Sequence, residues 1–284
     1  MGNGIAHVFA QNGFNVILID INENCLKSGL ENIKKNIDRQ IFKKQLKHSD
    51  KPSILSRITT NNNLKDGVNS SHLVIEAATE DYNIKKKIFQ EIDNYAPKNA
   101  ILATNTSSIS ITKLAATTER SSQVIGMHFM NPVPIMKLVE VIKGFATSKS
   151  TVSTIIKTVT DLEKIAIEVK DYPGFTANRI LLPMINEAIF SLFEGVAGVS
   201  EIDAVMKLGM AHPMGPLQLA DFIGLDVCLS ILRVLQEGIG ADKYRPCPLL
   251  VNMVSAGRLG KKSGEGFYKY DQNSKNFSVS KQFQ

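Results

Sequence analysis

The sequence predicts an α/β domain with a mostly parallel sheet, followed by an all-helical domain. In the first part of the chain, short apolar runs rich in β-branched residues alternate with segments of helical periodicity. This alternation is typical of strand–helix units around a parallel sheet. After the run at residues 165–169 the alternation stops, and long helical periodicity dominates. We therefore expect two domains, residues 1–170 and residues 171–284.

The elements of the first domain are expected in a regular order. Ile5, Val8 and Phe9 have helical spacing, and Gly13 suits a C-terminal cap, so a helix opens the chain. Buried strands are predicted at residues 16–19, 73–78, 100–104 and 124–128. The helices expected between them lie at residues 23–51 (a polar helical hairpin), 82–95 and 109–116. In the second domain, helices are predicted at residues 180–193, 202–208, 225–236 and 248–256.

The composition excludes several classes of protein. The longest apolar runs are far short of the roughly 20 residues that span a bilayer. Cys25, Cys228 and Cys247 are odd in number and have no CxxC spacing, which favours free thiols in a reducing compartment. The histidines form no metal-binding motif. No leader opens the sequence, so we expect the bacterial cytoplasm, or the mitochondrial matrix if a leader precedes these residues.

The net charge is +6, and a basic stretch lies between residues 34 and 51. Three interpretations are open: a solvated helix face, a site for a phosphate-bearing ligand, or a nucleic-acid surface. The third is disfavoured because aromatic residues are not interleaved and no nucleic-acid motif is present. The basic residues of this stretch are Lys34, Lys35, Arg39, Lys43, Lys44, Lys47 and Lys51.

The first residues resemble part of a Rossmann-type dinucleotide site. Such a site needs a strand, the turn G-x-G-x-x-G, a helix, a second strand and an acid about 20 residues further on. Gly2 can be the third glycine, and Asp20 follows the second strand. An acid there accepts hydrogen bonds from ribose hydroxyls and repels a 2′-phosphate, which favours NAD over NADP. The alternative is an acid that only begins a turn.

The first strand and the first two glycines of this pattern are absent. In the strand order 3-2-1-4-5-6 this strand is central, and each unpaired buried backbone group costs roughly 1–3 kcal/mol. We therefore expect about ten further residues before Met1 in the natural protein, enough for the strand and the two glycines.

One histidine and one carboxylate end two apolar segments that a proline-containing turn joins. His128 follows residues 124–127, and Glu140 follows residues 137–139. If the segments are neighbouring strands, the two side chains can face each other. A carboxylate on one imidazole nitrogen fixes the tautomer and stabilises the imidazolium, so the pair could take a proton from a hydroxyl. The alternative, which spacing alone favours, is a histidine at a strand end and an exposed glutamate.

Several segments together resemble one family, the L-3-hydroxyacyl-CoA dehydrogenases. They cover nearly the whole chain in the right order, and as a set they are highly specific. The segments are 1–6 (MGNGIA), 105–108 (NTSS), 128–140 (HFMNPVPIMKLVE), 173–179 (PGFTANR), 206–217 (MKLGMAHPMGPL) and 260–268 (GKKSGEGFY).

The resemblance implies NAD-dependent oxidation of an (S)-3-hydroxyacyl-CoA, in fatty-acid β-oxidation or butanoate metabolism, with a short chain such as 3-hydroxybutyryl-CoA expected. It makes His128 the general base and Glu140 its orienting partner. Ser107 and Asn178 are expected to contact the reacting oxygen. Their alternatives are ordinary helix caps. Asn105 is expected near the nicotinamide and the substrate, and Glu80 and Lys85 match a pair that contacts the cofactor.

The resemblance also gives the basic stretch a function, since coenzyme A carries several phosphate charges. Lys34, Lys35 and Lys43 are candidates to bind it, with Arg39 and Lys44 beside them. The helical domain is expected to close over the substrate and to form a homodimer. Two other functions remain open: a related dehydrogenase for a free hydroxy acid or sugar acid, and a truncated homologue without catalytic activity.

Overall fold

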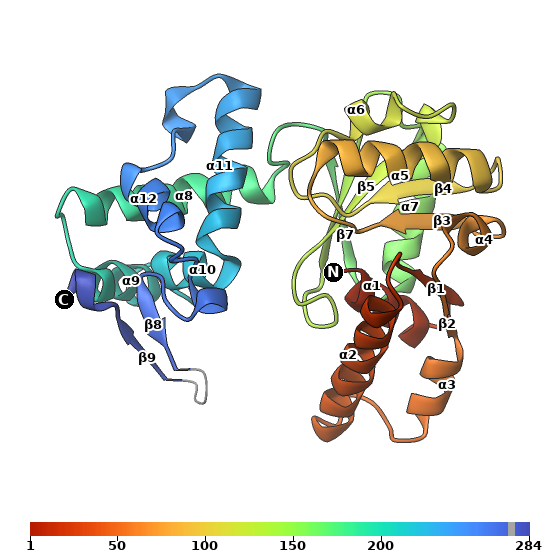
Figure 1. The fold of residues 1–284 in the computed structure, drawn as a ribbon, viewed down its shortest axis with the longest axis horizontal. Helices are drawn as coiled ribbons and strands as arrows, with labels where there is room; N and C mark the ends of the chain where they lie inside the picture. Colours follow the sequence, from red (N-terminus) through yellow and green to blue (C-terminus); the bar gives the residue numbers. More distant parts are fainter. Residues whose placement is uncertain (272–275) are drawn as a thin grey trace. The chain divides into compact units, whose positions relative to one another are not determined.

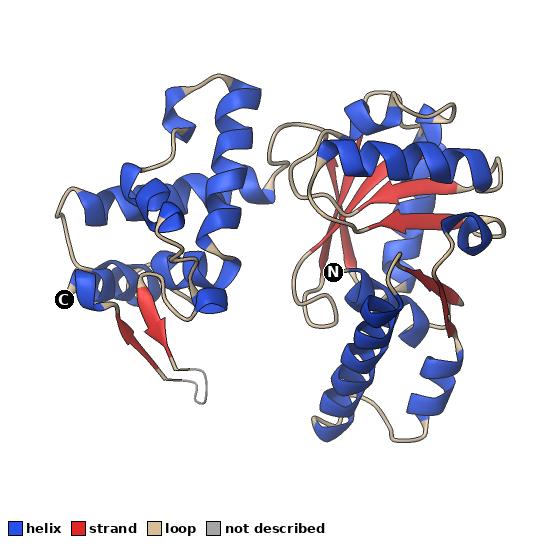
Figure 2. Cartoon of the chain, in the orientation of Figure 1, coloured by secondary structure: helices blue, strands red, loops and turns tan. Residues whose placement is uncertain are grey.

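The structure, a computed structural model, describes residues 1–271 and 276–284. The chain divides into two units, Met1–Tyr172 and Pro173–Gln284. Each unit has a hydrophobic core of its own. Figure 1 follows the chain through the units, and Figure 2 distinguishes their helices from their strands.

The first unit alternates strands and helices, as the sequence predicts. Its elements in chain order are α1 (Gly2–Gln11), β1 (Val16–Ile19), α2 (Glu23–Phe42), α3 (Asp50–Ser56), β2 (Ile58–Asn61), α4 (Leu64–Val68), β3 (Leu73–Glu76), α5 (Tyr82–Tyr95), β4 (Ile101–Thr104), α6 (Ile111–Ala115), β5 (Val124–Phe129), β6 (Leu138–Lys143), α7 (Lys149–Asp161) and β7 (Ile165–Lys170).

The main sheet has five strands in the order β3-β4-β5-β6-β7. Neighbouring strands are parallel except for β5 and β6, which are antiparallel. The predicted α/β fold with a mostly parallel sheet is thereby confirmed. The parallel strands β3, β4 and β5 end at the same edge of the sheet, so residues at or just after their C-terminal ends are brought together.

The strands β1 and β2 pair with each other in a separate parallel sheet. The sequence predicts that residues 16–19 are buried on both faces, but Ile17 in β1 is 38% exposed. The described hydrogen bonds of β1 to another strand run to β2, so this strand lies at a sheet edge. The strand β2 and the helix α4 were not predicted, because both are short and rich in polar residues.

Helix α5 shows where apolar periodicity misleads. It begins and ends as predicted, and the Asp81 side chain caps it by accepting from the Ile84 backbone N–H at 2.9 Å. However, Ile84, which shares helical spacing with Ile88 and Ile92, is 43% exposed, whereas Lys85 is buried. A lysine can replace an apolar residue here because its charge is paired with Glu76 inside the unit.

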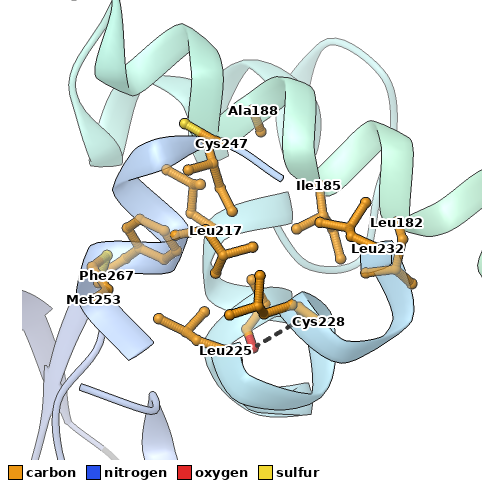
Figure 3. Close-up of a cluster of buried hydrophobic side chains, with 14 of the residues drawn as sticks. Leu182, Ile185, Ala188, Leu217, Leu225, Cys228, Leu232, Cys247, Met253 and Phe267 are labelled. Carbon is orange, nitrogen blue, oxygen red and sulfur yellow. Dashed lines mark hydrogen bonds between the residues drawn. The ribbon is translucent and has the colours of Figure 1, made fainter. Parts of the chain in front are cut away.

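The second unit is helical around one core. Its helices are α8 (Ala177–Phe193), α9 (Val199–Leu208), α10 (Pro216–Ile223), α11 (Leu225–Ile239) and α12 (Pro248–Ser255). Figure 3 shows Leu182 and Ile185 of α8 pointing toward Leu217 of α10 and Leu232 of α11. The unit is not purely helical, because β8 (Tyr268–Tyr270) and β9 (Phe277–Val279) pair antiparallel. Strands this short give no periodic signal.

Two buried aspartates organise the second unit. Asp203 accepts hydrogen bonds from the backbone of Leu217 and Gln218, at 2.8 and 3.0 Å, and so caps α10. Asp221 accepts from the backbone of Phe267 and Tyr268 at 3.0 and 2.9 Å. These carboxylates explain why glycines occur in the segments 206–217 and 260–268. A Cβ on Gly215 would overlap Asp203, and a Cβ on Gly266 would overlap Asp221.

Among the described residues, no helix is both long and apolar enough to cross a membrane. All three cysteines are free: Cys25 is exposed, whereas Cys228 and Cys247 are buried.

The titration of Asp221 predicts a pH dependence of stability. Burial raises the pKa of Asp221 to about 6, against the opposing hydrogen bonds from Tyr268, Phe267 and Tyr270. The folded state therefore binds more protons than the unfolded state between the ordinary value of 3.8 and about 6, so this contribution to stability falls as pH rises across that window. We expect the difference in free energy of unfolding, wild type minus Asp221→Asn, to be larger at about pH 4 than at about pH 7 in urea titrations.

The substitution Asp242→Asn, at an exposed aspartate of the same unit, is the matched control and should show no such trend. A difference for Asp221→Asn that grows with pH would contradict the prediction.

Candidate active site

The alternation of side chains along β5 and β6 separates a core face from a polar face. Ile125, Met127 and Phe129 of β5, with Val139 and Val141 of β6, belong to the apolar core that α1 and α7 also enter. The intervening residues of both strands point to the opposite face.

The packing of Gly126 locates that opposite face. A Cβ added to this glycine would lie 2.9 Å from Ile111 of α6, so this face of the sheet meets α6. Since His128 follows Gly126 by two residues, it projects on the same side. In the antiparallel register His128 lies directly opposite Glu140.

The side chains of His128 and Glu140 are buried and hydrogen-bonded to each other. The His128 Nδ1 atom lies 2.8 Å from Glu140 Oε2, and the side chains are 8% and 3% exposed. A carboxylate at this distance holds the ring proton on Nδ1 and leaves Nε2 as the nitrogen that can accept a proton. The arrangement expected if the two segments were neighbouring strands is therefore present.

Ser107 meets the other nitrogen of the same ring. Its Oγ atom lies 3.1 Å from His128 Nε2. Ser107 belongs to the loop between β4 and α6, which lies at the C-terminal end of β4 and next to the end of β5. Three residues from three segments thus form the line Ser107–His128–Glu140.

Asn105, the first residue of that loop, ties β4 to β5. Its side-chain oxygen accepts a hydrogen bond from the Phe129 backbone N–H at 2.9 Å, and its own N–H donates to the Glu76 carbonyl at 2.7 Å. Asn105 is 8% exposed. It therefore fixes the backbone next to His128, and its predicted place near nicotinamide and substrate stays a prediction.

Glu80 and Lys85 lie beside the serine loop. The Glu80 carboxylate accepts from the backbone N–H groups of Ser107 and Ser108 at 2.9 and 3.0 Å. The Lys85 ammonium lies 3.4 Å from Glu80 and 2.8 Å from Glu76, and its side chain is 1% exposed. The prediction that these two residues contact the cofactor stays a prediction.

Gly2 and Asp20, the other predicted cofactor residues, lie at the N-terminal end of α1 and just after β1. The first turn of α1 has neither a side-chain cap nor an acidic residue, so its backbone N–H groups present the positive end of a ten-residue helix. A Cβ on Gly2 would lie 3.8 Å from the side chain of Ala77, an ordinary van der Waals contact. Asp20 is half-buried and accepts from the Asn22 N–H at 3.2 Å.

The predicted coenzyme A residues lie on or next to α2. Lys34 and Lys35 lie within this helix and Lys43 follows its last residue. Lys34 pairs with Glu31 at 2.8 Å on the surface. This contact agrees with a solvated helix face. It leaves Lys35 and Lys43 as candidates to bind a phosphate-bearing ligand.

Asn178, the remaining predicted residue, belongs to the second unit. It lies in the first turn of α8 and is 9% exposed. Its predicted contact with the reacting oxygen stays a prediction.

Three polar residues near this site were not predicted. Glu76 ends β3 and accepts from Thr104 at the end of β4, at 2.7 Å. Asp171 accepts from the Ser110 hydroxyl at 2.8 Å and the Thr112 N–H at 2.7 Å, and so caps α6. A charged residue within an otherwise apolar run was the available signal for Glu76, but no local pattern connects Asp171 with α6, 60 residues away in sequence.

Comparison with known proteins places this geometry in a family. Residues 1–172 match the NAD binding domain of 3-hydroxyacyl-CoA dehydrogenase, and residues 174–270 match its C-terminal domain. A 3-hydroxybutyryl-CoA dehydrogenase of Bradyrhizobium diazoefficiens is 54% identical over 95% of this chain and 92% of its own length. A probable 3-hydroxybutyryl-CoA dehydrogenase of Bacillus subtilis is 52% identical, with 96% and 94% covered.

A solved structure agrees. The crystal structure of (S)-3-hydroxybutyryl-CoA dehydrogenase from Ralstonia eutropha matches with a TM-score of 0.92 at 49% identity, and 96% of each chain is covered. Since both domains match in order and the relatives are about half identical over nearly their full lengths, the chain belongs to the 3-hydroxyacyl-CoA dehydrogenase family, whose first domain binds NAD.

Proposed function

We propose that the protein oxidises an (S)-3-hydroxyacyl-CoA to the 3-oxoacyl-CoA with NAD, and that its substrate has a short chain such as 3-hydroxybutyryl-CoA. The observation that carries the proposal is the position of His128, whose two ring nitrogens meet Ser107 and Glu140. The names of the bacterial relatives support the substrate. The reaction is reversible in principle, and fatty-acid β-oxidation or butanoate metabolism is its setting.

The chemistry follows from the two nitrogens of His128. The ring nitrogen Nε2 removes the proton of the substrate 3-hydroxyl as the C3 hydride leaves. Glu140, held at Nδ1, stabilises the imidazolium that results. The hydroxyl of Ser107 positions the substrate oxygen beside Nε2, with Asn178 as a second donor. Bound NAD supplies the hydride acceptor.

The residues of the first unit fit the cofactor. The uncapped N-terminal end of α1, beginning at Gly2, suits the pyrophosphate, and the Asp20 carboxylate suits the ribose hydroxyls. Residues 1–170 act in this proposal as the NAD-binding domain, and the basic residues of α2 and its C-terminal cap receive the phosphates of coenzyme A.

The second unit, residues 171–284 in this proposal, is the substrate and dimerisation domain. Apolar side chains exposed on its helices support an interface, since surfaces of this kind are seldom left in water. They are Ile180 (68%), Val205 (59%), Leu208 (87%) and Phe222 (49%). The bacterial relatives support a cytoplasmic location.

The first test removes the base or its partner. The substitution His128→Gln or Glu140→Gln should lower kcat by roughly 100-fold or more, because proton removal loses its acceptor or the stabilised imidazolium. Binding of NAD should change little. The measurement is NADH absorbance for turnover and calorimetry for binding.

The substitution His72→Gln, at an exposed histidine of the same unit, is the control and should keep normal turnover. Near-normal turnover by both site variants would refute the mechanism.

The second test distinguishes the substrate class. Oxidation of 3-hydroxybutyryl-CoA should exceed that of free 3-hydroxybutyrate by several orders of magnitude in kcat/KM, because the free acid lacks the phosphates that the basic residues bind. Charge reversal of Lys35 and Lys43 should raise KM for the CoA ester with little change in kcat. Equal use of the two substrates would favour a dehydrogenase for free hydroxy acids.

A further inference from the structure

We propose that Glu80 is a positioning residue for the reaction: its carboxylate holds the loop that carries Ser107, so that the Ser107 hydroxyl meets His128. The inference rests on the proposed function, because it concerns the same site. It assigns to Glu80 a role that acts through Ser107, in addition to the predicted contact with the cofactor.

One carboxylate oxygen of Glu80 accepts hydrogen bonds from three consecutive residues of the loop that carries Ser107. Its Oε1 atom accepts from the backbone N–H of Ser107 at 2.9 Å and from the N–H and hydroxyl of Ser108 at 3.0 and 2.9 Å. It also accepts from the Thr106 hydroxyl. Three consecutive residues therefore donate to a single atom, which fixes the backbone on both sides of Ser107.

A buried ion-pair network fixes Glu80 in turn. The other oxygen of Glu80 lies 3.4 Å from the ammonium of Lys85. That ammonium also donates to both oxygens of Glu76, at 2.8 and 3.0 Å. Glu76 is bound by the Thr104 hydroxyl at 2.7 Å and by the Ala78 N–H at 2.6 Å. Because Glu76 and Thr104 are register partners in β3 and β4, the network is anchored in the sheet.

The ion-pair network is connected by hydrogen bonds to the residues that accept the proton. It runs from Glu76 at the end of β3, through Lys85 and Glu80, to the serine loop after β4. Ser107 then leads to His128 of β5 and Glu140 of β6. Figure 1 shows β3, β4 and β5 side by side in the sheet that carries these residues.

Glu80 is suited to this role because it stays ionised. Burial raises its pKa, but the hydrogen bond from Thr106, the charge of Lys85 and the bonds from Ser108 and Ser107 together lower the pKa below its usual range. A carboxylate accepts stronger hydrogen bonds than a neutral oxygen. The side chain is 38% exposed, so the loop is held at the edge of the site and not deep in the core.

The test is a double-mutant cycle with Glu80→Ala and Ser107→Ala. In the wild-type background and at saturating NAD, Glu80→Ala should lower kcat by roughly 10- to 100-fold, the scale on which a misplaced group acts. In the Ser107→Ala background the same substitution should change kcat by less than about twofold, because the residue through which it acts is gone.

Two further variants separate positioning from folding. The substitution Glu80→Gln keeps the size and one acceptor oxygen, so it should restore most of the kcat lost in the alanine variant. Should the alanine variant fail to fold, Glu80→Asp, which keeps the charge but withdraws the acceptor oxygens from the loop, enters the cycle in its place. The substitution Glu91→Ala, at an exposed glutamate of α5, is the matched control and should leave kcat unchanged.

The outcomes are distinct. Additive effects of Glu80→Ala and Ser107→Ala would overturn the inference, as would a raised KM for NAD at unchanged kcat, the signature of a cofactor contact. If His128→Gln and Ser107→Ala both keep normal turnover, the proposed function fails and the inference with it. If both lose turnover and Glu80→Ala does not, the inference alone is overturned.

Discussion

The pairing of β5 with β6 is the constraint on which the proposed site depends. These strands are the antiparallel neighbours of a sheet whose other pairs are parallel, and their register places His128 opposite Glu140. A slip of β6 by one residue would turn Glu140 into the apolar core and bring valines of β6 to the polar face. The core that fixes this register, with Met127, Val139 and Val141 fully buried, therefore also fixes the tautomer of the histidine.

A second constraint acts at the C-terminal ends of the parallel strands. The parallel strands β3, β4 and β5 end at one edge, and a polar residue at or beyond each end reaches across to its neighbour. Glu76 binds Thr104, and Asn105 binds the backbone of Phe129. Burying Lys85 among carboxylates costs desolvation, which the paired charges offset. Because this network holds the loop after β4 in one conformation, it also fixes the position of Ser107 relative to His128.

Local patterns predicted much of this fold, and their limits are physical. Apolar runs located β3, β4 and β5, and helical spacing located α5 from its first to its last residue. The pairing of His128 with Glu140 could be foreseen as a possibility, because both end apolar segments. The burial of Lys85 could not, since it depends on a carboxylate nine residues away that only the fold brings near. The contacts of Asp171 with α6 span 59 to 61 residues and leave no trace in local periodicity.

We propose that Glu140 holds the proton of His128 on Nδ1 and leaves Nε2 to accept the substrate proton. Nitrogen-15 NMR of the enzyme with labelled histidine, at a pH where the ring is neutral, reports which nitrogen carries the proton. We expect the His128 resonances to show a protonated Nδ1 and a bare Nε2. A proton on Nε2 in the neutral ring would contradict the assignment of His128 as the base.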